Sequence, residues 1–426
     1  MTALAGAYTR PAVDWGRRLA FGVAVLIVLS FSQAWVFPLL GEKGDPSASG
    51  LVRALYVPAY GGALILLLGA PGRTVMATLR QPFLILLLAI VGLSVFWSVA
   101  PDQTVRRVVA VYATTLAGLV FGARFRWAEL SEILATAFAI IAVTALFAAL
   151  AVPSIGVMHE IFPGAWRGTW VEKNQLGGNM GLAAGIFAAA ALLNPQRARL
   201  WWPFVGFAVF LILMSTSKTS LVAVTLALSG VVFVGLVRRG PIAGVAATWL
   251  AVLGIVILAG VAMSASDVFL NLLGKDATLT GRTKIWSAIL RRIAERPWTG
   301  YGYGAVWNEP APWGPLAWIV KDAGFKPQHA HNSWLEQWLG LGVFGLGAFC
   351  LTYLQTVVAA LVAVYRDKGA YLALPFLIGF SLMSLTESIA VTYNDFRWVI
   401  FTAIAVKLAW PDYHSEAEAA LGHQAL

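Results

Sequence analysis

Two histidines, His329 and His331, stand two residues apart in the segment QHAHNSWLEQWLGLGVFG, in a chain with five histidines among 426 residues. Histidine is the side chain whose unperturbed pKa lies closest to neutral pH, so such a pair suits proton transfer. The pair ends a long polar segment and directly precedes an apolar run in which Trp334 and Trp338 are residues typical of a membrane interface. This position indicates proton transfer at a membrane surface.

Four basic residues in polar stretches could hold an anion: Arg167, Lys173, Lys218 and Arg282. Lys218 is the strongest candidate, because STSKTS surrounds it with hydroxyl groups between two apolar runs. An ammonium group in that place needs an anionic partner or water, and phosphate or diphosphate fits. The alternative is that Lys218 and Arg167 extend to lipid head groups.

Glu387, in SLTESI, is an acid within the apolar run 371–391, and we expect it near the outer end of that helix. It could pair with Lys218 or orient a histidine, or it could be an ion-pair partner without a direct role. Further carboxylates near helix mouths are Glu172, Asp276, Glu336 and Asp395. No HExxH pattern and no paired glycosidase acids occur, and two histidines alone do not make a metal site, so we expect no metal.

The composition predicts an all-α polytopic membrane protein. Hydrophobic residues make up 59% of the chain and charged residues 12%, and the mean hydropathy is +0.76. These values exclude a water-soluble globular protein. Cys350 is the only cysteine and lies in an apolar run, so no disulfide can form within the chain.

Twelve apolar stretches have about the length that a membrane-spanning helix needs. They are 19–40, 51–70, 82–99, 107–123, 131–152, 175–193, 200–215, 219–237, 242–263, 333–364, 371–391 and 395–410. The first stretch follows three arginines but is long enough to span a bilayer, so we interpret it as a retained helix rather than a cleaved signal.

Basic residues collect in alternate loops, on the side of Arg17 and Arg18, as cytoplasmic loops require. They are Arg73, Arg80, Arg124, Arg126, Arg197, Arg199, Arg238, Arg239, Arg366 and Lys368. Both termini are therefore expected in the cytoplasm. The chain then divides into helices one to nine (1–263), a large periplasmic loop (264–332), and three helices with a tail (333–426). The outer face also holds 153–174 and the turn at Lys218.

Within the large loop, RTKIWSAILRRI at 282–293 places Ile285, Ile289 and Arg292 or Ile293 at helical spacing. This pattern predicts an amphipathic helix on the outer leaflet, capped by Thr280 and ended by Pro297. GYGYGAVW then predicts a tight loop that could approach a ligand. The loop's aromatic residues could stack on sugars or form an interface belt: Trp298, Tyr301, Tyr303, Trp307, Trp313 and Trp318.

These residues resemble the superfamily of O-antigen ligases and Wzy-type polysaccharide polymerases. WRGTWVEKNQLG (166–177) is similar to its first outer-face motif, STSKTS (215–220) to the helix mouth where ligases carry an arginine, and TGRTKIW (280–286) to the start of its periplasmic loop. HAHNSWLEQWLGLGVFG is similar to its histidine signature, and twelve helices with a large loop after the ninth match its layout. Lys218 departs from the ligase arginine, and the first and third motifs resemble exopolysaccharide polymerases of the succinoglycan type.

The resemblance implies a metal-independent, inverting glycosyltransferase of the GT-C type in a bacterial inner membrane. Its donor would be a glycan on undecaprenyl diphosphate, and it would need no cofactor. His331 would be the general base, with His329 beside it and Glu387 and Asn332 in support. The diphosphate would be bound by Lys218, Arg282, Arg167 and Lys173. Chemically, a neutral imidazole can take the proton of a sugar hydroxyl while fixed cations stabilise the departing diphosphate.

Alternatives remain. A polymerase would use a growing glycan as acceptor, whereas an O-antigen ligase would use the lipid A core. A lipid-linked glycan transporter should have charges near the midplane and repeated halves, but here the polar residues gather at one mouth. A membrane scaffold would leave Lys218, Arg282 and His331 unexplained. The expected surroundings are the lipid bilayer and glycan substrates, without nucleic acid.

Overall fold

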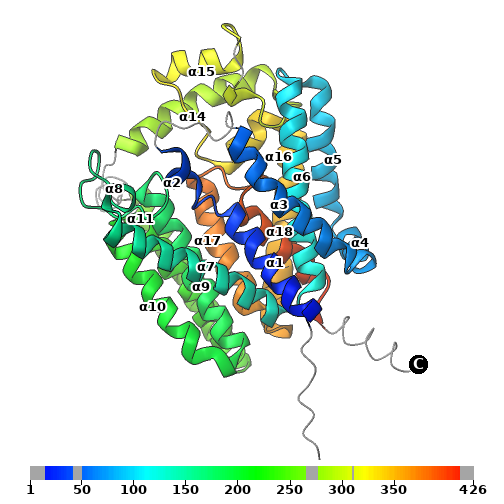
Figure 1. Cartoon of the computed structure of the whole chain (residues 1–426), viewed down its shortest axis with the longest axis vertical. Helices are drawn as coiled ribbons and strands as arrows, with labels where there is room; N and C mark the ends of the chain where they lie inside the picture. The colour runs from blue at the N-terminus through cyan, green and yellow to red at the C-terminus, as the bar shows by residue number, and fades with distance from the viewer. Residues whose placement is uncertain (1–14, 42–49, 265–276, 309–310, 413–426) are drawn as a thin grey trace, which may run out of the picture.

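The computed structural model describes residues 15–41, 50–264, 277–308 and 311–412. Within these ranges the chain is helical and has no β-strand, apart from an isolated bridge between Val157 and Trp166. The long helices run side by side, and α14 and α15 lie across one end of the bundle (Figure 1). The predicted all-α class is confirmed.

The helices before the second half of the chain are α1 (Trp15–Phe31), α2 (Val36–Leu40), α3 (Gly50–Leu68), α4 (Pro71–Leu79), α5 (Pro82–Leu93), α6 (Pro101–Arg124), α7 (Trp127–Ala151), α8 (Pro153–Gly156) and α9 (Lys173–Leu193). They are followed by α10 (Ala198–Ser215), α11 (Lys218–Val237), α12 (Pro241–Ser264), α14 (Ala277–Glu295), α15 (Pro315–Ala323), α16 (Ser333–Arg366), α17 (Ala370–Thr386) and α18 (Phe396–Ala409). Short 3-10 turns occur at Ser94–Trp97, Pro195–Arg197 and Val306–Asn308.

Seven helices in the described ranges are long and apolar enough to cross a membrane, and there are eight if the bent pair α4 and α5 forms one span. The two helices of that pair meet at 95°. Shorter apolar helices occur at Pro241–Gly254 and at α17. The chain is therefore a multi-pass membrane protein. The count of twelve spans stays a prediction.

Two predicted helix boundaries are wrong. The stretch 19–40 is not one helix, because α1 ends at Phe31 and the chain turns at Gln33, where φ is +57°, before α2 begins. The stretch 371–391 ends early, since α17 stops at Thr386 and Glu387 has an extended backbone. Ser333 explains this ending: its hydroxyl donates to the carbonyl of Glu387 and accepts from the backbone N–H groups of Ile389 and Ala390.

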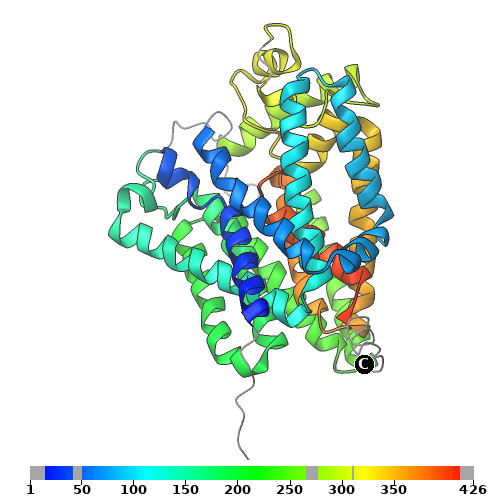
Figure 2. The ribbon, with the colours of Figure 1, turned by 45° about the vertical axis from the view of Figure 1, so that its right-hand side comes forward.

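The basic loops lie together at the end of the bundle opposite α14 and α15 (Figures 1 and 2). Four arginines of these loops contact the ends of other helices: Arg17 pairs with Glu129, Arg80 donates to the Ala409 carbonyl, Arg124 to that of Leu66, and Arg238 to that of Val364. The residues that the charge pattern assigned to one face therefore share one end of the molecule. That end is also where α1 begins and α18 ends.

The helix predicted at 282–293 is confirmed as part of the longer α14. Its Ile285, Ile289 and Ile293 are buried, and they form a second hydrophobic core with residues of α15 and of the loop between the two helices. Pro297 follows the end of the helix, as a helix-ending residue should. The side chain of Thr280, the predicted cap, and Asp276 lie outside the part of the chain that the structure describes.

The GYGYG loop docks into a break in α16. At Gly342 the backbone has φ +68° and ψ −167°, and a Cβ there would lie 2.1 Å from the carbonyl oxygen of Trp298. The carbonyls of Leu339 and Gly340, freed by the break, accept from the N–H groups of Tyr301 and Gly302 at 3.0 and 2.8 Å. The loop therefore fastens the end of α14 to α16.

Candidate functional site

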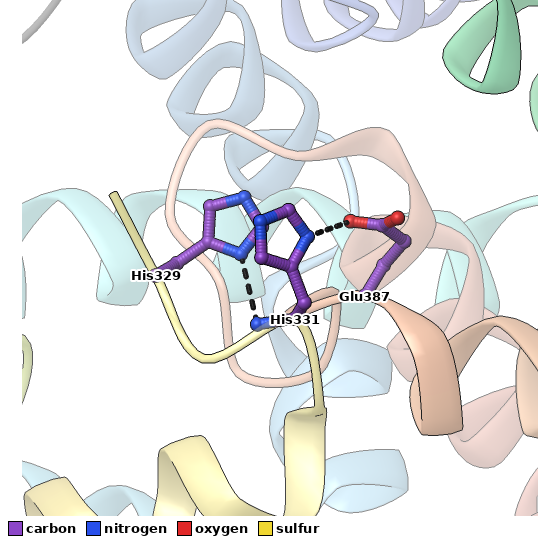
Figure 3. A group of neighbouring side chains, drawn as sticks. All are labelled: His329, His331 and Glu387. Carbon is purple, nitrogen blue, oxygen red and sulfur yellow. Dashed lines mark hydrogen bonds and ion pairs between the residues drawn. The ribbon is translucent and has the colours of Figure 1, made fainter. Parts of the chain in front are cut away.

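Three ionisable side chains converge: His329, His331 and Glu387 (Figure 3). The histidines precede α16, and the glutamate follows the last residue of α17. His331 Nδ1 lies 3.2 Å from Glu387 Oε2, and the two imidazole rings have centroids 3.9 Å apart. The histidine pair and Glu387 are thus one cluster.

The start of α16 fixes the direction of both histidines. Asn332 caps the helix, its Oδ1 accepting from the N–H groups of Trp334 and Leu335 at 2.9 and 3.1 Å. His331 has a φ of +49°, which a non-glycine residue rarely adopts. Its backbone N–H donates to His329 Nδ1 at 3.1 Å. His329 Nδ1 must therefore be unprotonated, and this contact orients the second ring.

Glu336 binds the backbone between the two histidines. Its carboxylate accepts hydrogen bonds from the backbone N–H of Ala330 at 2.9 Å, from Ser388 Oγ at 3.0 Å and from Trp307 Nε1. Trp286 of α14 donates to the Ala330 carbonyl at 2.9 Å. The residue between the two histidines is thereby tied to α14 and α16 alike. Glu336 is a positioning residue rather than a reacting one.

Arg282 joins the cluster from α14. Its Nη2 lies 2.8 Å from Glu387 Oε1, while the other carboxylate oxygen faces His331. The side chains of Arg282, His331 and Glu387 are 18%, 26% and 29% exposed, so the cluster is shielded but reachable. Lys218, the other partner considered for Glu387, has no ion pair in the described part of the chain and is exposed.

The ionisation of the cluster follows from its contacts. Burial raises the pKa of Glu387, but the hydrogen bond from His331 and the charges of the histidines and Arg282 outweigh it, so the pKa is lowered overall. Burial, and next the charge of His331, lowers the pKa of His329 to about 4. Glu387 is therefore an anion and His329 a neutral imidazole at neutral pH.

Glu172, the residue that caps α9, belongs to the same electrostatic group. Desolvation, and next the charge of Glu387, raises the pKa of Glu172, while His331 and Arg282 act in the opposite direction. Arg397 of α18 also acts on the cluster, because its charge contributes to lowering the pKa of His329. No sequence pattern marked Arg397, because it lies inside the apolar stretch 395–410 that is predicted as a helix. Asp395 pairs with it and caps α18.

A small pocket opens beside the cluster, between the first turns of α9 and α11. Its lining includes Arg282 and Glu387 on one side and Asn174, Ser217 and Ser220 on the other. Ser217 Oγ donates to Asn174 Oδ1 at 2.9 Å and contacts Ser220 Oγ at 2.8 Å. The N-terminus of a helix attracts anions through its dipole and its N–H groups. Lys218 begins α11 at this pocket.

Lys173 and Arg167 are placed differently from Lys218. Lys173 is buried, its Nζ lies 3.6 Å from the centroid of Phe162, and it donates to Thr216 Oγ1 at 3.4 Å. Arg167 is buried as well. It donates to backbone carbonyls of Ile155, Ser154 and Val171 at 2.9, 3.1 and 3.5 Å. Arg167 therefore folds the segment before α9, and the structure does not bring it into the histidine cluster.

The six loop aromatics separate by burial. Tyr301, Tyr303 and Trp307 are buried and pack against the protein, so their ring faces are not available to a sugar. Trp298 and Trp313 are exposed, at 62% and 81%, and Trp318 is half-buried in α15. Only these last three fit either of the two predicted roles.

The cluster also has the composition of a metal site, since one ligand atom from each of His329, His331 and Glu387 lies within 4.8 Å of the others. Its surroundings fit a cation poorly. Arg282 holds the second oxygen of Glu387, and a backbone N–H occupies His329 Nδ1. The arrangement suits a hydrogen-bonded base better than a metal.

Comparison with known proteins gives two matches. Residues 203–350 match the model of a family described as O-antigen ligase. The chain is also 28% identical, over 271 residues, to the exopolysaccharide production protein ExoQ of Rhizobium meliloti (strain 1021). These matches support an O-antigen ligase/Wzy-type family. The predicted resemblance to that family is thus confirmed.

The family match contains much of the cluster. It covers α14 with Arg282, the histidine segment and the beginning of α16, whereas Glu172, Glu387 and Arg397 lie outside it. The match to ExoQ covers 60% of the chain, and the chain spans 59% of the length of that relative.

Proposed function

We propose that this protein polymerises exopolysaccharide or O-antigen repeat units at the periplasmic face of a bacterial inner membrane. The reaction transfers a glycan from undecaprenyl diphosphate to an acceptor sugar hydroxyl with inversion. The contact of Glu387 with His331 Nδ1 carries this proposal, because a hydrogen bond at Nδ1 leaves the other ring nitrogen, Nε2, to act as a base. The likeness to an exopolysaccharide production protein favours polymerisation over ligation.

In the proposed mechanism Glu387 accepts a hydrogen bond from Nδ1–H of His331, so the proton stays on Nδ1 and the lone pair is on Nε2. Among the described residues no hydrogen bond occupies Nε2. This nitrogen removes the proton of the acceptor hydroxyl as the hydroxyl attacks the sugar carbon, and the resulting imidazolium is stabilised by the Glu387 carboxylate. His329 keeps its ring against His331 and stays neutral, since its pKa of about 4 lies well below neutral pH.

The diphosphate leaves toward the pocket between α9 and α11. Arg282 lines this pocket, and the dipoles of the first turns of the two helices point to it. Lys218 supplies a further charge at its rim. Lys173, held against Phe162 and Thr216, adds positive potential from inside. Fixed positive groups at the leaving oxygens lower the barrier by stabilising the charge that grows there.

The proposed topology has twelve spans, with helices one to nine in 1–263, a periplasmic loop in 264–332 and three spans and a cytoplasmic tail in 333–426. The gathering of the basic loops at the end where α1 begins and α18 ends supports it, because that end would be cytoplasmic. The histidine cluster near α14 then faces the periplasm. A transporter is a poorer fit, since the charges cluster at one mouth.

The experiment that tests this function measures glycan transfer by purified protein from a lipid-linked donor, in the presence of a chelator. Wild type is expected to remain active, and His331→Ala to lose about a thousandfold in rate while still binding donor. His159→Ala is the matched control, because His159 is exposed in the loop before α9 and its ring forms a hydrogen bond with the Pro153 carbonyl. Wild-type transfer by His331→Ala would overturn the assignment.

An O-antigen ligase that joins polysaccharide to the lipid A core is the second candidate, favoured by the description of the matched family. Cells that lack the protein distinguish the two. Loss of a polymerase leaves single repeat units on the lipid carrier, whereas loss of a ligase leaves full-length polymer on it. Accumulated polymer would replace the proposed acceptor by the lipid A core.

A further inference from the structure

A second cavity, of about 780 Å³, lies at the C-terminal end of α14, where this helix meets α15 and the Tyr301 loop. Its charged lining consists of Arg292, Glu295 and Arg296, and its aromatic lining of Tyr301, Trp313 and Trp318. This volume is typical of a site for a small organic molecule. The proposed transfer reaction does not use any of these side chains.

The two tryptophans are not placed as an interface belt would be. Their ring centroids lie 6.3 Å apart, and Trp313 is 81% exposed. α15, which contains Trp318, lies beyond the ends of the long helices and not around them (Figures 1 and 2). Trp298 differs, because its ring packs on Phe344 of α16, with centroids 6.0 Å apart, on the side of a long helix. Trp298 is therefore a belt residue and Trp313 is not.

The lining has the chemistry that binds sugars. The flat faces of tryptophan rings cover the C–H face of a sugar, while guanidinium and carboxylate groups bind its hydroxyls. Arg292 Nε is buried and has no hydrogen-bond partner in the described residues. Arg292 Nη1 and Tyr301 Oη hold the carboxylate of Glu295 at 2.7 and 2.8 Å, so the polar groups are fixed in place. Preorganised groups of this kind reduce the cost of binding.

The cavity and the reacting cluster share one helix. Arg282 lies at the cluster, Arg292 follows ten residues later on α14, and Arg296 comes directly after the end of this helix. At the rise of an α-helix this separates the two places by roughly 15–20 Å. One sugar attached to the diphosphate would not reach the cavity, but an oligosaccharide would.

We propose that this cavity binds a stretch of glycan several sugars away from the bond that reacts. The proposal rests on the function proposed above. The bound stretch belongs either to the donor repeat unit or to the acceptor chain, which present the same chemistry. The cavity holds one glycan chain while the next sugar bond forms. The enzyme therefore keeps long chains bound between transfers.

The experiment uses purified full-length protein and oligosaccharides cut by mild acid from the host's own exopolysaccharide and sorted by length. Their binding is measured by calorimetry with wild type, Trp313→Ala and Arg296→Ala. Trp298→Ala is the matched control, because Trp298 is an exposed tryptophan that packs on α16 and does not line the cavity. The expected result is a loss of about tenfold or more in affinity for Trp313→Ala and Arg296→Ala, with Trp298→Ala unchanged. Equal affinity of Trp313→Ala and wild type would overturn the proposal.

Transfer assays then separate the two sources of glycan. If the cavity holds the acceptor, Trp313→Ala raises KM for long acceptors and leaves that for short ones unchanged. If it holds the donor, KM for the lipid-linked donor rises with every acceptor. Trp313-dependent oligosaccharide binding without any transfer would overturn the proposed function, and the cavity would remain a glycan-binding site without a role in transfer. A different result would overturn this inference alone. In it, transfer still requires His331, but Trp313→Ala changes neither the KM for the acceptor nor the KM for the donor.

Discussion

Arg167 and Arg282 occupy similar places in the sequence, each in a polar stretch with a tryptophan nearby, yet their contacts differ. The guanidinium of Arg167 donates to three backbone carbonyls and lies over the ring of Phe37, 4.4 Å from its centroid. Arg282 faces a carboxylate beside a histidine and lines a pocket. An arginine whose guanidinium is bound to backbone carbonyls holds a loop in place. An arginine paired with a carboxylate beside a pocket can instead release that carboxylate and bind an anionic substrate.

The largest expected effects separate these two arginines. Arg282→Ala should lower the transfer rate by about 100- to 1000-fold and leave the thermal unfolding temperature nearly unchanged, because it removes a cation from the leaving group. Arg167→Ala should instead destabilise the fold by a few kcal/mol, since buried carbonyls lose their donors. Transfer assays and thermal unfolding of both purified variants make the comparison. A stable but inactive Arg167→Ala would place that residue in the site after all.

Lys218 should give a smaller effect, because it is exposed and only its neighbours Ser217 and Thr219 line the pocket. Lys218→Ala should weaken donor binding by about tenfold, Lys218→Arg should be partly tolerated, and Lys218→Glu should be inactive. Donor titrations of the three variants measure this series. A Lys218→Glu variant that transfers glycan normally would remove Lys218 from the diphosphate site.

Most residues of the cluster could be predicted from the sequence, but the contacts between them could not. His329, His331, Arg282 and Glu387 stand out as polar residues beside apolar runs, and the structure brings them together. That Glu387 bridges His331 and Arg282 depends on α17 ending at Thr386. The end of α17 depends in turn on Ser333, whose hydroxyl binds three backbone groups. A contact between residues 54 to 57 positions apart leaves no local pattern in the sequence.

The same reasoning explains why the two arginines looked alike. Burial decides between them, and burial of Arg167 follows from the packing of α8, the following loop and α2 against one another, which no motif encodes. The helices themselves were easier, because apolar length and charge marked most of them. The failures at Gln33 and Glu387 occur where a turn interrupts an apolar run, and hydropathy does not respond to turns.

The smallest expected effect concerns pH. The pKa of His329 is about 4 in the folded protein against 6.5 as the ordinary value, so the unfolded chain binds the proton more readily. Stability is therefore full above pH 6.5 and falls as the pH drops toward 4. His329→Gln lacks this loss and should be more stable than wild type at pH 5 by roughly 1–2 kcal/mol, relative to their difference at pH 7.5. The free energy of unfolding of both proteins is measured at pH 5 and pH 7.5. The same difference between the two proteins at both pH values would contradict the burial of a neutral His329.

The central claim is that Glu387 acts through His331, and a double-mutant cycle tests it most directly. Single-turnover transfer is measured for wild type, Glu387→Gln, His331→Ala and the double variant, with saturating donor. If the two residues form one unit, Glu387→Gln slows wild type by about 10- to 100-fold but adds nothing to the loss already caused by His331→Ala. Losses that multiply would show that Glu387 and His331 act independently and would contradict the account.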